Sequence, residues 1–211
     1  MLVGTKGGEI VEISLKSKTL LRTIMQSHYE SELWGLTINP TDSYEVATGG
    51  GDKSLRIWDL KKNKQKKFMM FPEDFRAIDW SSDGKVIIFG TMAGKIYYVA
   101  VKKWTRSAPF KSIFYTDAKG KAQKSDKDKW IQELKISPNN EYVAFGSHCG
   151  LGNTFSKIQV LQVTGNAKAP LKAYVTVDPK ITSALTHLDW STDNDRIVCN
   201  SLAFELKYVS I

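Results

Sequence analysis

Short apolar strands separated by polar turns recur along this chain of 211 residues, without any stretch of sustained helical periodicity. Four stretches share one order: an apolar strand, a polar turn, a second strand ending in small residues, another turn and a third strand. The first strands end around Ile38, Trp80, Ile136 and Trp190, which are separated by 42, 56 and 54 residues. Self-similarity at this scale indicates one structural unit used several times.

The strands within a repeat differ in their pattern. Second strands such as 86–90 are nearly continuous apolar runs, which suits burial on both faces. Third strands such as 54–58 alternate polar and apolar side chains. Outer fourth strands are expected at 67–71, 111–115 and 171–175. Four short strands per repeat predict an all-β fold, a β-propeller with four-stranded blades of the WD type, in which the longer two spacings contain loop insertions.

The repeats divide the chain into one propeller over 1–211, which we expect to be incomplete and part of a longer protein. The predicted blades are 26–72, 73–116 and 130–178, with partial blades at 1–25 and 181–211 and a basic insertion at 117–129. The first partial blade lacks a first strand and the last lacks a fourth. Strand edges left unpaired in this way favour self-association.

Composition places the chain among ordinary globular proteins, with 42% hydrophobic and 25% charged residues. No apolar run of about 18 residues occurs, and no basic and apolar leader follows Met1, so neither a transmembrane segment nor a signal peptide is predicted. Cys149 and Cys199 lack metal-ligand spacing. Reduced thiols in a cytoplasmic protein are the expected interpretation.

The net charge of +8 favours acidic partners, which include protein tails, nucleic acid and anionic membrane surfaces. Two lysine clusters carry much of it: Lys61, Lys62, Lys64, Lys66 and Lys67 form the first, and Lys119, Lys121, Lys124, Lys127 and Lys129 the second. Trp104 and Trp130 flank the second cluster and could anchor an interface or pack against a neighbouring blade. A purely structural alternative is that the lysines solvate turns and protect strand edges.

Residues that could carry catalysis or hold a cofactor are not grouped in the sequence. The glycines at 49–51 lack phosphate-loop spacing and join two strands. His28, His148 and His187 lie in different repeats without a second ligand at metal spacing. We therefore predict no catalytic residue, no metal and no cofactor.

One blade resembles the WD-repeat signature closely, through His28, the segment 33–36 and the segment 47–59. The resemblance implies a structural hydrogen-bonded set of His28, Thr48, Asp52 and Trp58. Together with the segments 5–10, 31–36 and 186–191, the chain resembles the C-terminal propeller of the echinoderm microtubule-associated protein-like family. Members of that family carry two joined propellers that bind tubulin and signalling proteins. The later repeats lack the Trp-Asp pair and are divergent.

These observations predict a non-catalytic protein-interaction scaffold. The resemblance implies association with the cytoskeleton, with tubulin as the nominated protein partner and the two lysine clusters, Trp104 and Trp130 as the candidate binding surface. The alternative function is a nucleic-acid or anionic-surface binding module that uses the basic insertion. We expect nucleic acid to be the less favoured partner, because arginines that could read bases are few.

Overall fold

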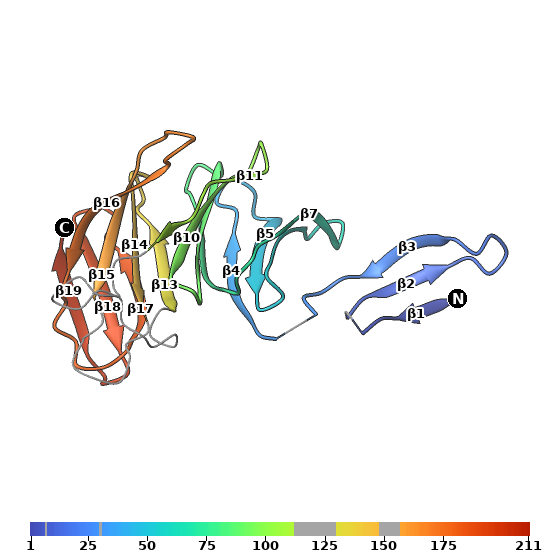
Figure 1. The fold of residues 1–211 in the computed structure, drawn as a ribbon, viewed down its shortest axis with the longest axis horizontal. Helices are drawn as coiled ribbons and strands as arrows, with labels where there is room; N and C mark the ends of the chain where they lie inside the picture. Colours follow the sequence, from blue (N-terminus) through green and yellow to red (C-terminus); the bar gives the residue numbers. More distant parts are fainter. Residues whose placement is uncertain (7, 30, 112–129, 148–156) are drawn as a thin grey trace.

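Every regular element in the computed structural model is a β-strand, across the residues that it describes: 1–6, 8–29, 31–111, 130–147 and 157–211. The strands form five antiparallel sheets (Figure 1). In chain order these are β1 (Leu2–Gly4), β2 (Ile10–Ile13) and β3 (Leu20–Met25); β4 (Leu33–Ile38), β5 (Glu45–Gly50), β6 (Ser54–Asp59) and β7 (Lys64–Met70); β8 (Phe75–Trp80), β9 (Val86–Thr91), β10 (Lys95–Ala100), β11 (Thr105–Arg106) and β12 (Phe110–Lys111); β13 (Ile131–Ile136), β14 (Tyr142–Ser147), β15 (Ile158–Val163) and β16 (Leu171–Val177); and β17 (Leu185–Trp190), β18 (Arg196–Ser201) and β19 (Leu206–Ser210). The all-β prediction is confirmed, and so is an incomplete propeller, because the sheets do not close into a ring.

The four sheets from β4 to β19 lie side by side in chain order, whereas the sheet β1–β3 stands to one side of them (Figure 1). Neighbouring sheets meet through their first strands: β8 packs between β4 and β13, and β13 packs against β17. Each of these four sheets therefore places its first strand on the inner side and its later strands progressively outward, as blades of a propeller do.

Glycines near the ends of the second strands allow the next sheet to approach closely. The facing pairs are Gly49 with Phe75, Gly90 with Ile131 and Gly146 with Leu185. At Gly90 an added Cβ would lie only 2.3 Å from Cγ2 of Ile131. The small residues seen at the ends of the second strands thus have a physical reason, because the first strand of the following sheet occupies the space of a side chain.

Apolar side chains fill the spaces between adjacent sheets and form three buried clusters in the described residues. The first is rich in aromatic rings: Phe71 and Phe89 meet edge to face with centroids 4.7 Å apart, and Phe75 and Phe89 lie 4.1 Å apart. Both Phe75 and Phe89 are fully buried. Stability in this arrangement comes from contacts between neighbouring sheets, as in repeat proteins generally.

Turns between first and second strands also connect neighbouring sheets. Asn140 adopts a left-handed conformation with φ 62°, and its side-chain oxygen accepts a hydrogen bond of 2.8 Å from the backbone N–H of Ser82. Asn194, at φ 66°, accepts the N–H of Asn139 at 2.9 Å. Asparagine tolerates this conformation better than most residues, so one residue type makes the turn and also binds the adjacent sheet.

In two sheets the pairing outside the third strand begins earlier in the chain than predicted. In the third sheet two short strands, β11 and β12, both pair with β10. Residues 107–109 interrupt them, and Pro109 has no N–H to donate to a ladder. Of the strand predicted at 111–115, only Lys111 belongs to the described residues. In the second sheet β7 begins at Lys64 and not at Lys67, so part of the first lysine cluster lies on a strand.

Candidate protein-interaction surface

The four residues expected to form a hydrogen-bonded set lie together at one end of the second sheet. Trp58 donates from Nε1 to Oγ1 of Thr48 at 2.6 Å, and Thr48 Oγ1 lies 2.8 Å from Nε2 of His28. Nδ1 of His28 lies 2.7 Å from the carboxylate of Asp52. Because an ionised carboxylate only accepts, Nδ1 of His28 donates to Asp52. A chain of polarised bonds thus ties residue 28 to the interior of the sheet.

Two further residues that sequence reasoning missed extend this set. Ser54 donates from Oγ to both oxygens of Asp52 at 2.8 Å, and Arg56 donates from Nη2 to Asp52 at 2.8 Å. Arg56 is only 5% exposed although it alternates with apolar residues on β6. A buried guanidinium requires a buried anion, and Asp52 supplies it. The sequence does contain a signal for this buried ion pair: Arg56 is a basic residue on the third strand, four positions after the aspartate of the turn.

The ionisation of Asp52 reflects these contacts. Burial on its own raises the pKa of this carboxyl, but hydrogen bonds from His28 and Ser54 outweigh burial and lower the pKa from 3.8 to about 2. Its side chain is fully buried. Asp52 therefore accepts hydrogen bonds from three neighbouring side chains inside the protein, so the arrangement stabilises the turn and the strand that follows it.

The first lysine cluster forms an exposed ridge on the turn between β6 and β7 and along β7. Lys62 and Lys66 form ion pairs with Asp59 and Glu45, respectively. Lys61 lies over the ring of Tyr44, with its Nζ 4.1 Å from the centroid. The carboxylates of both pairs are mostly buried, whereas the lysine side chains are about half exposed or more, so the ammonium groups can still be reached by a partner.

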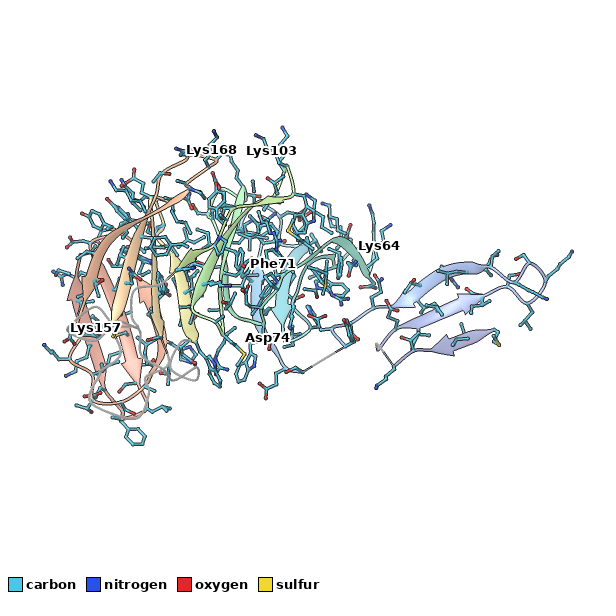
Figure 2. All side chains as sticks on the ribbon, viewed as in Figure 1. Lys64, Phe71, Asp74, Lys103, Lys157 and Lys168 are labelled. Carbon is cyan, nitrogen blue, oxygen red and sulfur yellow. The ribbon has the colours of Figure 1, made fainter. Side chains whose placement is uncertain are left out.

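Lys64 and Lys67 of the same ridge differ in their surroundings. Lys64 projects from the side of the sheet (Figure 2) and has no ion-pair partner among the described residues. Lys67 is half-buried, donates to the carbonyl of Val101 and lies over the ring of Trp104. Burial lowers the pKa of Lys67, and the neighbouring Lys66 lowers it further. Lys67 thus belongs to the contact between two sheets.

Trp104 and Trp130 are both half-buried at contacts between sheets. Trp104 donates from Nε1 to the carbonyl of Phe68 at 3.0 Å, which joins the turn after β10 to β7. Trp130 lies beneath the guanidinium of Arg76, 4.9 Å from the ring centroid, and the same guanidinium lies 4.0 Å from Trp34. The structure therefore places these tryptophans at two separate contacts between neighbouring sheets.

The second lysine cluster lies outside the described residues, as do His148 and Cys149. That cluster comprises Lys119, Lys121, Lys124, Lys127 and Lys129. Within the described part of the chain, no group of three or more histidine, cysteine or acidic side chains could hold a metal ion. The same residues include no helix long and apolar enough to cross a membrane.

The Asp-Trp pairs at equivalent positions of two repeats contribute to packing between sheets, but in different ways. Asp79 accepts the backbone N–H of Ile136 from the next sheet at 2.8 Å. Burial raises the pKa of Asp79, although this hydrogen bond opposes the effect. Trp190 donates from Nε1 to the carbonyl of Lys135 at 3.0 Å, whereas Nε1 of the buried Trp80 has no partner among the residues that the structure describes.

Comparison with known proteins agrees with the arrangement of sheets. The family model of the echinoderm microtubule-associated protein second beta-propeller matches residues 33–211. The 77 kDa echinoderm microtubule-associated protein of Lytechinus variegatus is 26% identical over 186 residues, which are 88% of this chain and 24% of that protein. Echinoderm microtubule-associated protein-like 2 of Homo sapiens is 26% identical over 208 residues, 99% of this chain and 28% of that protein. The chain thus spans about a quarter of the length of these relatives.

Proposed function

This chain belongs to the echinoderm microtubule-associated protein family, within the second β-propeller, and on that premise we propose that it is a non-catalytic protein-interaction scaffold associated with the cytoskeleton. The observation that carries the proposal is the family match over 33–211, and the names of the relatives nominate microtubules as the assembly to which it binds. Cytoplasmic localisation follows from that partner.

The exposed lysines of the ridge, Lys61, Lys62, Lys64 and Lys66, support the proposal physically. The ridge presents positive charge along an outer strand, where a partner can approach without displacing core side chains. Acidic protein tails are complementary to such a ridge, and complementary charge increases the rate of association. The inward-directed network around Asp52 supports a structural and not a catalytic role for the buried polar residues of this sheet.

Co-sedimentation with polymerised tubulin tests the proposal. We expect the chain to pellet with microtubules at low salt, less at moderate salt, and less again when the acidic tubulin tails are removed by protease. The sharpest variant is Lys61→Glu with Lys64→Glu, because neither lysine pairs with a carboxylate in the described residues and the fold is spared. A charge-matched control is Lys16→Glu with Lys18→Glu, on the exposed turn between β2 and β3.

The outcomes separate the alternatives. Weaker pelleting of the ridge variant than of the control supports a tubulin-binding ridge. Equal pelleting of both variants would remove the ridge from the proposal, and no pelleting of the unmodified chain would overturn microtubule binding. Competition by duplex or single-stranded oligonucleotides would instead favour a nucleic-acid-binding module.

A further inference from the structure

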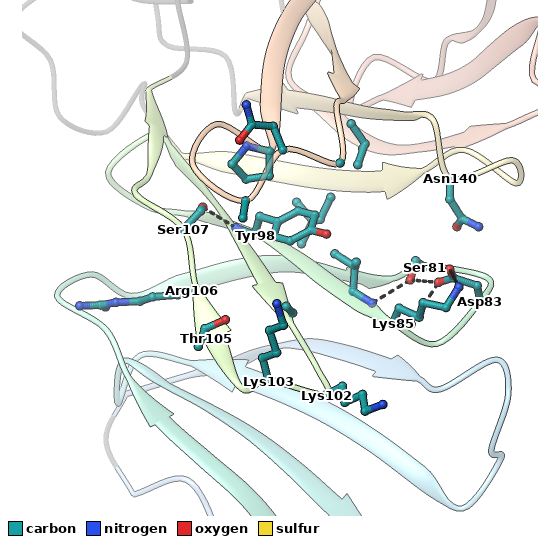
Figure 3. A pocket seen from close by; sticks show the side chains of 18 of the residues that line it. Ser81, Asp83, Lys85, Tyr98, Lys102, Lys103, Thr105, Arg106, Ser107 and Asn140 are labelled. Atoms are coloured by element: carbon teal, nitrogen blue, oxygen red, sulfur yellow. Dashed lines mark hydrogen bonds and ion pairs between the residues drawn. The ribbon is translucent and has the colours of Figure 1, made fainter.

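A groove of about 550 Å³ lies between the third and fourth sheets, at the end where two loops approach each other (Figure 3). One wall comes from the turn between β8 and β9, from β10 and from the segment 102–107. The opposite wall comes from the end of β13 and from the loop between β15 and β16. A volume of this size is in the range of sites that accept small ligands or a few peptide side chains.

The floor of the groove is apolar and continuous with the buried cluster between the two sheets. Val86, Tyr98, Ile136 and Val163 are each half-buried and pack against that cluster. Their other sides face the groove. An apolar surface that is already backed by a rigid core can receive an apolar side chain without rearrangement, and its burial would be favourable.

The rim is basic. Lys102 and Lys103 are exposed, and no carboxylate of the described residues forms an ion pair with either of them. Lys85 is paired with the single acidic lining residue, Asp83, at 2.9 Å. Arg106 lies over the ring of Phe71, so its charge is directed toward the neighbouring sheet. Lys102 and Lys103 are therefore the rim charges available to an occupant.

Tyr98 lies in the middle of the groove and adds a directional group (Figure 3). Burial raises the pKa of its hydroxyl, and the charge of Asp83 raises it further, so the group stays protonated and can donate. Its hydroxyl has no hydrogen-bond partner among the described residues, whereas its backbone is held by Ser107, which donates its N–H to the Tyr98 carbonyl at 2.9 Å. A carboxylate or peptide carbonyl would supply the missing acceptor.

The walls are held in place from both sheets. Asn140 of one wall accepts from Ser82 of the other and also donates to the Ser82 hydroxyl at 2.7 Å. In the loop at the other end, Thr164 donates from Oγ1 to the carbonyl of Ala169 at 2.7 Å. Lys103 and Lys168 project at the same end of the stacked sheets (Figure 2). A preformed site of this kind loses less conformational entropy on binding.

We propose that this groove binds an acidic peptide segment of a partner protein, with one apolar side chain of the peptide on the floor and its carboxylates beside Lys102 and Lys103. The inference deepens the proposed function. It rests only on the part of that proposal in which the chain binds another protein. A peptide fits better than nucleic acid, because the floor is mainly aliphatic and offers the ring of Tyr98 alone for base stacking, whereas single-stranded nucleic acid sites use several aromatic rings.

Fluorescence anisotropy with the full chain tests the inference. The probe is a fluorescein-labelled peptide of glutamates around one phenylalanine; its matched versions carry serine for phenylalanine, or lysines for glutamates. We expect Lys102→Glu with Lys103→Glu to weaken binding of the probe by about tenfold or more, and added salt to weaken it as well. Lys16→Glu with Lys18→Glu is the charge-matched control and should retain the affinity of the unmodified chain.

A second pair of variants tests the opposite wall. Ala167 is exposed in the loop between β15 and β16 and lines the groove. Ala167→Lys should strengthen binding of the probe and Ala167→Glu should weaken it, because both change charge on the wall that faces the lysines. The inference would be overturned if all these variants bound the probe with equal affinity, or if the unmodified chain bound the serine version of the probe as tightly as the phenylalanine version. Preferential binding of an oligonucleotide that the probe cannot displace would also overturn it.

Microtubule binding and peptide binding in the groove can be refuted independently of each other. Probe binding that depends on the groove, without pelleting on microtubules, would overturn the tubulin assignment and leave the groove standing. Pelleting without probe binding would overturn the groove alone.

Discussion

Replacing Asp52 by asparagine is expected to cost this chain a large part of its stability, although the substitution changes neither the size nor the shape of the side chain. The carboxylate accepts from His28, Ser54 and Arg56, and both Asp52 and Arg56 are buried. An amide retains some of these hydrogen bonds but leaves the guanidinium as an uncompensated buried charge. Breaking a buried pair in this way costs about 3–5 kcal/mol.

The pH dependence provides an independent measure of the same contacts. The folded-state pKa of Asp52, about 2, is below its usual value of 3.8, so the group contributes stability above about pH 4 that is lost as the pH falls toward 2. The difference corresponds to about 2 kcal/mol. The asparagine variant lacks this group, so the stability gap between it and the unmodified chain should narrow by about that amount between about pH 5 and about pH 2.

Urea denaturation followed by tryptophan fluorescence measures both effects. Asp195→Asn is the matched control, because Asp195 also lies beside an arginine, at 3.8 Å, but both side chains are more than half exposed. The control should change stability by less than about 0.5 kcal/mol. If Asp52→Asn and Asp195→Asn have equal effects, or if the acid limb of the unfolding curve is the same with and without Asp52, the network does not hold the sheet as described.

Three further outcomes follow from packing between the sheets. Trp190→Phe should cost about 1 kcal/mol more in urea denaturation than Trp80→Phe, because only Trp190 loses a hydrogen bond from its ring nitrogen. Gly90→Ala should destabilise by about 1–3 kcal/mol in the same assay, because its new methyl group overlaps Ile131. Tyr208, 67% exposed on β19, lies on an apolar outward face. We therefore expect light scattering to show concentration-dependent dimers that Tyr208→Glu weakens, and a monomer at all concentrations would contradict this.

The order of strands was predictable because each strand repeats the same local pattern of apolar runs and turns. The second strands, such as β9, were found where their continuous apolar residues predicted them. The sequence showed that small residues recur at the ends of these strands, but it did not show why they are needed there. That reason is the contact of Gly90 with Ile131, across a spacing that sequence periodicity does not encode.

Resemblance to a known signature predicted the hydrogen-bonded set around Asp52. It did not predict that Ser54 and Arg56 also belong to this set. Polar and apolar side chains alternate along β6, yet Ser54, Leu55, Arg56 and Ile57 are all buried. A single buried carboxylate makes this possible, since it satisfies Ser54 and Arg56 together. Periodicity describes which face a side chain occupies, but not whether a partner allows a polar group to be buried there.

The groove shows most clearly why binding surfaces are harder to predict than folds. Lys102 and Lys103 follow one sheet, whereas Ile136 and Val163 belong to the next, and nothing in the spacing of these residues marks them as neighbours. Between β11 and β12, residues 107–109 leave the pairing with β10, and Ser107 of this interruption lines the groove. In the recognition site that we propose, paired strands supply the walls, and the segment after β10 supplies the rim charges of Lys102 and Lys103.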